Sequence, residues 1–421
     1  MPEKIVLAYS GGLDTSVAIR WLKEERGYDV VALTADVGNE KDLRTIEQRA
    51  LATGAVRAVI VDAKADFIRY FAFPALAAGA VYEGAYPLAT ALARPLIAKL
   101  MVDVAREVGA AAVAHGCTGK GNDQVRFDVS VQALAPDLKI VAPLREWDMR
   151  TREQEIEYAR KHNIPVPVTR ASPYSVDENL WGRSVEAGPL EDPWTEPPEE
   201  IYAWTKPVDA TPSEPRYIEI GFEHGIPVSL DGEEMDGVTL VQTLNRLAGE
   251  HGVGRIDHLE DRLVGIKSRE IYEAPAAVTL LRAHETLEHM TLTKAQIRMK
   301  AIVAQEYADL IYNGLWFSAH HQDLAAYVQS TQRHVTGVVR VRLHRGHATP
   351  VGVKSPRGLY DYALATYDQA DQYDHTAAEG FIRIWGLPLR VQARKQLLAE
   401  PGDPLRIAGP GQSRGAKRHE V

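Results

Sequence analysis

Residues Lys4–Ser16 read KIVLAYSGGLDTS, and this stretch decides the fold of the N-terminal part of the chain. Residues Ile5–Tyr9 show no polar alternation, which is typical of a strand buried on both faces of a parallel sheet. The Ser10–Gly12 turn ends the strand, and apolar residues from Val17 onward recur at helical spacing. The sequence therefore predicts a strand, a glycine turn and a helix. The N-terminal amides of such a helix favour an anion, usually phosphate.

The type of phosphate loop follows from what surrounds the glycines. No lysine follows them, as a Walker loop requires, and the G-x-G-x-x-G dinucleotide fingerprint is absent. The motif SGGLDTS at 10–16 instead resembles the pyrophosphate loop (PP-loop) of the ATP pyrophosphatases. Its glycines allow close approach of an oxyanion, and Ser10, Thr15 and Ser16 add hydroxyl donors. An ordinary strand-to-helix turn is the alternative interpretation.

Length and composition bound the remaining possibilities. At 421 residues the chain is expected to form more than one domain. The net charge of −9 counts against a broad nucleic-acid surface. The single cysteine, Cys117, excludes an intramolecular disulfide and a cysteine-rich zinc site, and no resident metal site is expected. Met1–Ser10 is too short for a signal peptide, and no apolar run approaches the ~20 residues of a membrane span. We expect a cytoplasmic protein without nucleic-acid or membrane partners.

Further buried-strand patterns alternate with helical patterns up to about residue 165, which predicts a parallel sheet built from right-handed βαβ units. The expected strands are Asp29–Thr34, Arg57–Asp62, Ala111–His115 and Lys139–Ala142. Ligands bind such sheets at the carboxyl ends of the strands. Three segments that follow strands should therefore converge on one crevice: Ser10–Ser16, Ala35–Gly38 and Gly116–Arg126.

The segment HGCTGKGNDQVRFD at 115–128 combines flexible glycines with polar side chains. Arg126 can hold a carboxylate with two hydrogen bonds, and Asp123 can hold an ammonium group, so the pair looks like an amino-acid clamp. A glycine loop with a solvated salt bridge is the alternative. Cys117 is interpreted as a small buried thiol rather than a nucleophile.

The rest of the chain predicts a mixed α+β domain. Strand patterns occur at 217–230, 338–343 and 350–354, and helical patterns at 241–250, 277–290 and 294–312. Pro189–Pro215 is expected to be an extended arm or linker, and Thr376 with Glu379 fits a capping box that opens a short helix. The fold class is α/β, with an N-terminal parallel-sheet nucleotide-binding domain of the adenine nucleotide α-hydrolase-like type. The expected boundaries are 1–165 for the nucleotide-binding domain, 166–370 for the mixed domain, 371–400 for a C-terminal helix and 401–421 for a disordered tail.

Four motifs in fixed order make the resemblance specific. They are SGGLDTS at 10–16, HGCTGKGNDQVRF at 115–127, SVDENLWGRS at 175–184 and GIKSREIYE at 265–273. With them the sequence resembles the argininosuccinate synthetase family over nearly the whole chain. The resemblance implies ATP-dependent joining of citrulline and aspartate, with AMP and pyrophosphate released through a citrulline-adenylate intermediate. It also implies Mg²⁺, a role in arginine biosynthesis and a homotetramer. On this resemblance, residues 1–165 are the ATP-binding domain, 166–370 the synthetase domain and 371–400 the oligomerisation helix.

The resemblance also implies roles for individual residues. The residues expected to bind ATP are Ala8, Tyr9, Ser10, Gly11, Gly12, Leu13, Asp14, Thr15, Ser16, Ala35 and Gly116. Those matching the aspartate site are Thr118, Asn122 and Asp123. Those matching the citrulline site are Tyr86, Thr90, Asn122, Arg126, Ser175, Ser184, Glu260 and Tyr272. Asp14, Asp123 and Arg126 are the candidate catalytic residues, and Asp14 is also the nearest candidate to hold Mg²⁺ or to order the loop.

Three other functions are possible for a chain with this loop. A tRNA-modifying PP-loop enzyme needs paired cysteines and a basic RNA-binding surface, which one cysteine and a charge of −9 do not supply. Another AMP-forming PP-loop ligase would normally couple to ammonia or a glutaminase domain, and nothing here resembles an N-terminal glutaminase. A non-catalytic adenine-nucleotide-binding protein would not need the clamp at Asn122, Asp123 and Arg126.

Overall fold

The strand that carries the glycine turn lies in the middle of a five-stranded parallel sheet with the order β3-β2-β1-β4-β5. The computed structural model describes residues 2–39, 42–149, 151–165 and 173–397. The strands of this sheet are β1 (Lys4–Ala8), β2 (Asp29–Asp36), β3 (Arg57–Asp62), β4 (Ala112–Ala114) and β5 (Lys139–Val141). The parallel sheet expected from the sequence is confirmed.

Helices cover both faces of this sheet because successive side chains of each strand point to opposite sides. Ile5 and Leu7 pack with α1, α2 and α8 on one face, whereas Val6 packs with α5 and α6 on the other. The helices of this region are α1 (Leu13–Glu24), α2 (Leu43–Thr53), α3 (Lys64–Phe67), the π-helical turn η1 (Ile68–Ala72), α4 (Phe73–Ala78), α5 (Ala89–Val108), α6 (Asn122–Leu134), α7 (Pro143–Glu146) and α8 (Arg152–Lys161).

The strand order fixes where a ligand site can form. The chain passes from β1 to β2 and β3 on one side, and then returns to place β4 on the other side of β1. Ligands of open parallel sheets bind at this kind of reversal, beyond the carboxyl ends of the strands. The loops after β1 and β4 are therefore neighbours, as the sequence predicted.

Two antiparallel sheets follow. A four-stranded sheet has the order β11-β12-β7-β6, and a five-stranded sheet has the order β10-β9-β8-β13-β14. Their strands are β6 (Ser175–Asn179), β7 (Gly182–Glu186), β8 (Arg216–Glu223), β9 (Ile226–Leu230), β10 (Glu233–Glu234), β11 (Arg255–Asp261), β12 (Lys267–Glu273), β13 (Gly337–His344) and β14 (His347–Lys354). The predicted strands at 217–230 are a hairpin, whose turn at His224 and Gly225 takes positive φ at both residues.

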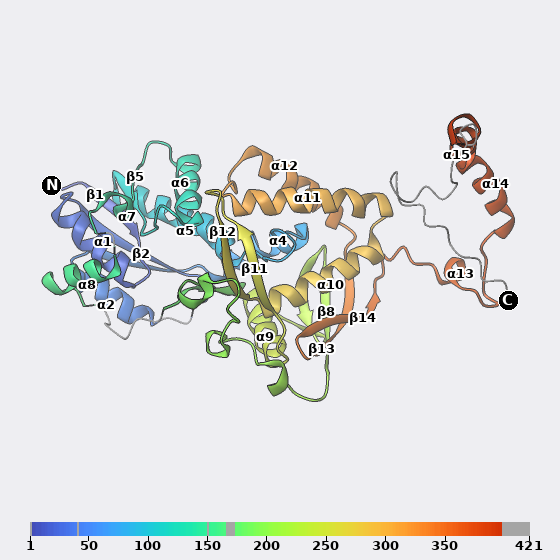
Figure 1. Cartoon of the computed structure of the whole chain (residues 1–421), viewed down its shortest axis with the longest axis horizontal. Coiled ribbons are helices and arrows are strands. Elements are labelled where there is room, and N and C mark those ends of the chain that lie inside the picture. The colour runs from blue at the N-terminus through green and yellow to red at the C-terminus, as the bar shows by residue number, and fades with distance from the viewer. Residues whose placement is uncertain (1, 40–41, 150, 166–172, 398–421) are drawn as a thin grey trace. The chain divides into compact units, whose positions relative to one another are not determined.

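Four long helices share one apolar core with the five-stranded sheet, and they lie in the yellow and orange part of the chain in Figure 1. They are α9 (Gly237–Glu250), α10 (Pro275–Thr291), α11 (Lys294–Tyr312) and α12 (Ala319–Gln332). Helices α9 and α10 contact the sheet, whereas α11 and α12 pack against α4. The largest apolar core lies here and also takes in α4 and the first half of α5. Residues from the N-terminal third therefore contribute to the core of the later part of the chain.

The segment Pro189–Pro215 is not the free arm or linker that its prolines suggested. It forms three short 3₁₀ turns, η2 (Gly188–Glu191), η3 (Glu199–Ile201) and η4 (Val208–Ala210), and buries Leu190 and Ile201. The buried carboxylate of Glu273 accepts hydrogen bonds from the backbone N–H groups of residues 203–205 at 2.9 Å each. This contact fixes the segment to the end of β12.

The chain divides into two compact units, Met1–Leu359 and Tyr360–Val421. The second contains α13 (Tyr362–Ala365), α14 (His375–Trp385), α15 (Leu387–Gln392) and the π-helical turn η5 (Ala393–Leu397). The prediction that Thr376 is the N-cap of α14 was wrong. The N-cap is Asp374, whose side chain accepts hydrogen bonds from the first N–H groups of the helix. The predicted disordered tail lies outside the described residues.

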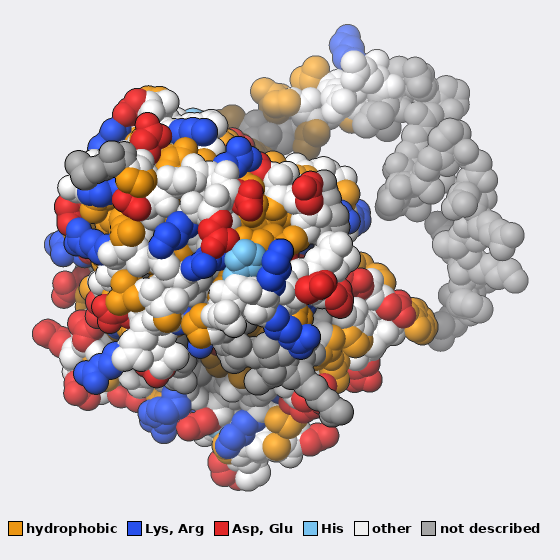
Figure 2. Space-filling view, turned by 90° about the vertical axis from the view of Figure 1, so that its left-hand side faces the viewer, with side chains coloured by type: hydrophobic (Ala, Val, Ile, Leu, Met, Phe, Trp, Pro, Cys, Tyr) orange, Lys and Arg blue, Asp and Glu red, His pale blue; other side chains and the backbone are white. Residues whose placement is uncertain are grey.

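The visible surface of the protein is mixed in charge. On the face shown in Figure 2, acidic and basic side chains are interspersed, with no extended field of one sign. Within the described ranges, no helix is both long and apolar enough to cross a membrane.

Candidate functional site

The turn after β1 presents backbone donors to the crevice. Gly11 has φ of +79°, a conformation that glycine adopts without strain, and Gly12 is the N-cap of α1. Among the described residues, no side chain caps this helix end. The first amides of α1 therefore keep their ability to bind an anion. Leu13 and Asp14 form the first turn of the helix, and both are half-buried.

The hydroxyl groups of this loop are ordered by contacts within it. Ser10 Oγ lies 3.1 Å from Thr15 Oγ1, and Tyr9 Oη lies 2.9 Å from Ser16 Oγ. Arg49 of α2 donates to the carbonyl of Gly11. The sequence analysis missed Arg49, which brings a positive charge to the predicted phosphate loop.

The loop after β4 packs directly against the loop after β1. A Cβ atom at Gly116 would lie 2.8 Å from Thr15 Cγ2, so only glycine allows this approach. His115 connects the loop to α6, because its Nδ1 accepts a hydrogen bond from the N–H of Cys117 at 3.2 Å and its Nε2 lies 2.7 Å from Asp128 Oδ1. Ala8 ends β1, and Ala35 lies near the end of the adjacent β2. The predicted ATP-binding residues thus come from three neighbouring strands of the sheet.

The two charged residues of the predicted clamp pair with each other. Asp123 and Arg126 lie one helical turn apart at the start of α6, and Arg126 Nη1 donates to Asp123 Oδ1 at 2.9 Å. Burial acts to raise the pKa of Asp123, but the positive charges of Arg94 and Arg126 outweigh it and hold the pKa below its ordinary value. Thr118 is exposed in the loop that precedes them.

One nitrogen of the Arg126 guanidinium has no hydrogen-bond partner among the described residues. The side chain is 4% exposed, and its Nε donates to the carbonyl of Tyr312 at 2.9 Å. That nitrogen is Nη2, which is buried. A buried guanidinium edge without an acceptor is costly, and a carboxylate is the group that best satisfies it.

Arg94 of α5 joins this cluster and was missed by the sequence analysis. Its guanidinium contacts Asp123 Oδ2 through Nε at 2.8 Å and Asp177 Oδ1 through Nη2 at 3.0 Å. Arg94 is the first charged residue in an otherwise apolar stretch, ATALARPLIA, and that isolation is a signal that could have identified it. Asp177 belongs to β6, so Arg94 connects α5, α6 and the four-stranded sheet.

The start of α5 carries the next two predicted residues. Tyr86 Oη accepts the N–H of Thr90 at 2.9 Å and takes the place of a side-chain cap on α5. Leu88, the N-cap, has φ of +68°, which is rare for a bulky residue and marks stored strain. Tyr86 also stacks on Tyr272, with ring centroids 4.2 Å apart. Burial raises the pKa of Tyr86, and the nearby charge of Arg126 partly offsets the increase.

The remaining predicted residues share one face of the four-stranded sheet. Ser184 lies opposite both Asp177 and Tyr272 across the strands, and Ser175 is two residues before Asp177. Because side chains alternate along a strand, these residues point to the same side. The opposite side carries Val185 and Ile271, which lie in a separate apolar cluster.

Glu260 is buried despite its charged sequence neighbours, with 2% of its surface exposed. Its carboxylate accepts hydrogen bonds from Tyr272 Oη and Tyr312 Oη at 2.5 Å each. From sequence alone a solvated position was the ordinary expectation for Glu260, and only the family resemblance pointed to a site. Tyr312 was not predicted, because a tyrosine that follows apolar residues at the end of an amphipathic helix is interpreted as a core residue.

Carboxylate oxygens also lie beside the phosphate loop. Glu155 of α8 faces Asp14, and burial followed by the charge of Asp14 raises the pKa of Glu155 to about 8. Among the described residues there is no group of three or more histidine, cysteine or acidic side chains that could hold a metal alone. Two carboxylates suit Mg²⁺ only where phosphate oxygens complete the coordination.

Comparison with known proteins gives one consistent result. Residues 4–165 match the profile of the arginosuccinate synthase N-terminal HUP domain, and residues 174–392 match that of the arginosuccinate synthase C-terminal domain. The chain is 58% identical over 400 residues to an argininosuccinate synthase of Dehalococcoides mccartyi, covering 95% of this chain and 98% of the relative. It is 60% identical over 393 residues to that of Gloeobacter violaceus, covering 93% and 98%. For the Bacillus pumilus protein the identity is 58% over 391 residues, covering 93% and 96%.

Proposed function

Because the chain belongs to the argininosuccinate synthase family, we propose that the crevice described above binds ATP, citrulline and aspartate side by side. The chain is an enzyme that ligates citrulline and aspartate in arginine biosynthesis, with ATP as co-substrate. The observation that supports the arrangement is the contact between Gly116 and Thr15, which joins the predicted phosphate loop to the loop that leads into Asn122, Asp123 and Arg126. The tRNA-modifying alternative and other PP-loop ligases are not favoured.

We assign the triphosphate to the turn after β1. The N-terminus of α1 has no side-chain cap among the described residues, which suits it to an anion, and Arg49 adds positive charge at the carbonyl of Gly11. In-line transfer to a nucleotide phosphorus needs mainly alignment and neutralisation of charge. The absence of an obvious nucleophile from the candidate residues fits this requirement, because no covalent enzyme intermediate is needed.

We assign the amino acids to the groups around Arg126. The free Nη2 of Arg126 would bind the citrulline carboxylate, with Tyr86, Thr90, Ser175, Ser184, Glu260 and Tyr272 around the rest of that substrate. Thr118, Asn122 and Asp123 would hold aspartate. Asn122 begins α6 between the two groups, as joining two amino acids requires.

The chemistry then proceeds in two displacements. The ureido oxygen of citrulline attacks the α-phosphorus of ATP, the bond to the bridging oxygen breaks, and pyrophosphate leaves. The aspartate amine then attacks the activated carbon, loses a proton, and AMP departs with the former ureido oxygen. Fixed N–H donors and guanidinium groups supply the electrostatic stabilisation of both transition states.

Mg²⁺ fits the oxygen-donor pair at the phosphate loop. Asp14, with Glu155 beside it, would hold the ion together with phosphate oxygens. When bound, the ion would neutralise charge on the β- and γ-phosphates. Its binding can be followed without turnover by titrating the protein with Mg·ATP in a calorimeter and repeating the titration with Asp14→Asn.

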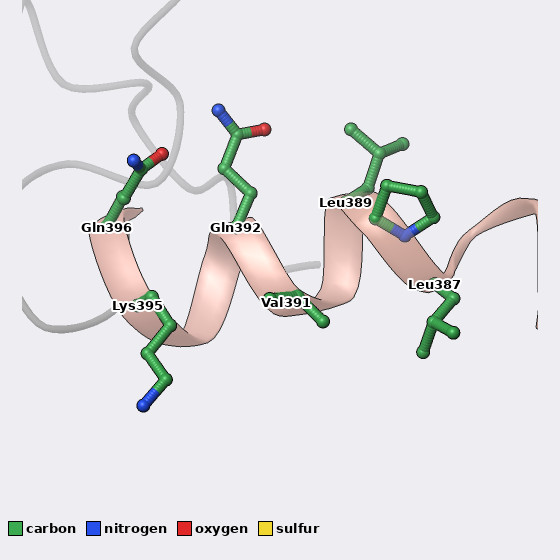
Figure 3. A pocket seen from close by; sticks show the side chains of 7 residues that line it. Leu387, Leu389, Val391, Gln392, Lys395 and Gln396 are labelled. Carbon is green, nitrogen blue, oxygen red and sulfur yellow. The ribbon is translucent and has the colours of Figure 1, made fainter.

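We also propose a homotetramer in which the C-terminal helices are covered by other copies of the chain. Large apolar side chains on α14 and α15 are 50–74% exposed: Phe381, Ile382, Ile384, Trp385, Leu387, Leu389 and Val391. Figure 3 shows the side chains of Leu387, Leu389 and Val391 extending from this helical segment, and all three line a surface pocket. Light scattering of the whole chain and of Trp385→Ser would give the masses that test this assembly.

A cytoplasmic location is proposed from the biosynthetic role of the family.

The reaction itself is tested with purified protein, ATP, Mg²⁺, citrulline and aspartate, each amino acid being omitted in turn. Argininosuccinate, AMP and pyrophosphate should form together only in the complete mixture. Citrulline labelled with ¹⁸O in the ureido group should pass the label to AMP. If AMP carries no label, the adenylate intermediate is wrong, and if no AMP forms in any mixture, the catalytic assignment fails.

A further inference from the structure

Tyr312 lies at the centre of the amino-acid site although none of the predicted roles includes it. It is the last residue of α11, and its side chain is fully buried. Its ring stacks on Tyr82 with centroids 3.6 Å apart, and the guanidinium carbon of Arg126 lies 4.8 Å from the ring centroid. The ring is therefore held on two sides before any hydrogen bond is considered.

The hydroxyl of Tyr312 bridges two of the predicted substrate residues. Asn122 Nδ2 donates to Tyr312 Oη at 2.8 Å, and Tyr312 Oη donates to Glu260 Oε1 at 2.5 Å. Burial, followed by the negative charge of Glu260, raises the pKa of Tyr312, so the hydroxyl keeps its proton. Since a phenol has one proton to give and Glu260 is an acceptor, the direction of both bonds is fixed.

The same chain of contacts fixes the orientation of the Asn122 amide. The backbone N–H of Leu263 lies 2.9 Å from Asn122 Oδ1, and an N–H can only donate. Oδ1 must therefore face Leu263, which leaves Nδ2 toward Tyr312. One bond comes from the loop between β11 and β12, and the other comes from the end of α11.

We propose that Tyr312 is a positioning residue for the ligation, because its hydroxyl fixes Asn122 and Glu260 relative to each other. It thereby fixes the position of the citrulline site relative to the aspartate site. The proposal rests on the assignment of Asn122 to both substrates and of Glu260 to citrulline. Tyr312 is not required to touch substrate. The two side chains that it joins belong to α6 and β11, which are separated by more than 120 residues of sequence.

The test variant is Tyr312→Phe, which keeps the ring and its stacking and removes only the bridging oxygen. A hydrogen bond to a charged group contributes enough that its loss should raise KM for both citrulline and aspartate about tenfold or more. KM for ATP should change less than twofold, because no contact of Tyr312 reaches the phosphate loop among those described. Assays are run well below the melting midpoint of the least stable variant.

Two tyrosines serve as matched controls. Tyr307→Phe removes a hydroxyl from a buried tyrosine on the same helix, outside the site. Tyr82→Phe removes a hydroxyl from the same ring stack, where Oη donates at 2.8 Å to the carbonyl of Asp261 and not to Asn122. Both controls should keep KM for the two amino acids within about twofold of the wild-type value.

A double-mutant cycle separates positioning from simple stability. In an Asn122→Ala background, Tyr312→Phe should add little to KM for aspartate, because the hydroxyl then has no amide to hold. If Tyr312→Phe lowers the melting temperature while leaving both amino-acid KM values unchanged, Tyr312 is only structural and the proposal is wrong. Full additivity in the cycle would also overturn it. Failure of the wild-type protein to form argininosuccinate would instead overturn the site assignment on which the proposal depends.

Discussion

Substitution of Arg126 by lysine tests the amino-acid site at its most constrained point. The change keeps the positive charge but removes the planar fork, including the Nη2 edge that has no partner among the described residues. Lysine cannot reproduce the fixed geometry in which Nε donates to Tyr312 and Nη1 donates to Asp123. The loss should therefore appear first in binding of the carboxylate that Nη2 is assigned to hold.

The magnitude follows from the kind of bond removed. A hydrogen bond between charged groups contributes about 1.5–3 kcal/mol, or roughly 10- to 150-fold in binding. Lysine retains the charge, so we expect KM for citrulline to rise about 10- to 50-fold. Arg94 still pairs with Asp123 in the variant, so the carboxylate is not left alone. KM for ATP should stay within about twofold.

Steady-state kinetics with citrulline varied and the other substrates saturating would measure this effect. Arg106→Lys provides the matched control, because Arg106 makes an exposed ion pair with Asp137 away from the site. An unchanged KM for citrulline together with a lower melting temperature would show that Arg126 is a structural partner of Asp123. A rise confined to KM for aspartate would assign Arg126 to the other substrate.

Three further predictions concern the phosphate loop, the docked segment and acid stability. Asp14→Ala should slow AMP formation about a hundredfold, because misaligned reacting groups react that much more slowly, and should change the melting temperature little. Unchanged turnover would exclude a role of Asp14 in Mg²⁺ binding or loop ordering. Glu273→Gln should destabilise the fold by about 3–5 kcal/mol, because an amide would place N–H groups against backbone donors that now face a carboxylate. The loss of stability would be measured from the thermal unfolding midpoint, with Glu219→Gln as a control at an exposed glutamate. Equal midpoints for the two variants would contradict the prediction. Burial lowers the pKa of His321 to about 4. An unfolded histidine titrates near 6.5, so His321 lowers stability progressively as pH falls from about 6.5 to about 4. His321→Phe should flatten the melting-temperature profile in that window, and an unchanged slope would refute the assignment.

The parts of the fold that follow local rules could be predicted from the sequence. β1, the glycine turn and α1 form one continuous pattern, and the alternation of strands and helices predicted a parallel sheet in which the loops after β1 and β4 approach each other. Helix α11 also begins and ends where its periodicity indicated. The elements themselves depend on periodicity and turn chemistry that a window of about twenty residues contains, and the approach of the two loops follows from the general rule for parallel sheets.

Contacts between distant segments were not predictable in the same way. The prolines at 189–215 indicated an extended arm, and nothing local shows that Glu273, nearly seventy residues later, binds its backbone. Tyr312 meets Asn122 across 190 residues, so no spacing rule could have linked them. At α14 the error was smaller: Asp374 competes with Thr376 for the cap, and aspartate is at least as good an N-cap as threonine.

The pairing of charges around Asp123 explains how the site can be both buried and ready to bind. An isolated guanidinium in this position would cost several kcal/mol, so Arg94 and Arg126 must share an anion when no substrate is present. Asp123 supplies it, and the two arginines in turn hold its pKa below its ordinary value. Nη2 of Arg126 is the group that this arrangement leaves unpaired among the described residues. A carboxylate that reaches this donor gains a charged hydrogen bond without separating Asp123 from Arg94. If the proposed assignment to Arg126 holds, the substrate carboxylate would complete a network that is otherwise satisfied, rather than break one.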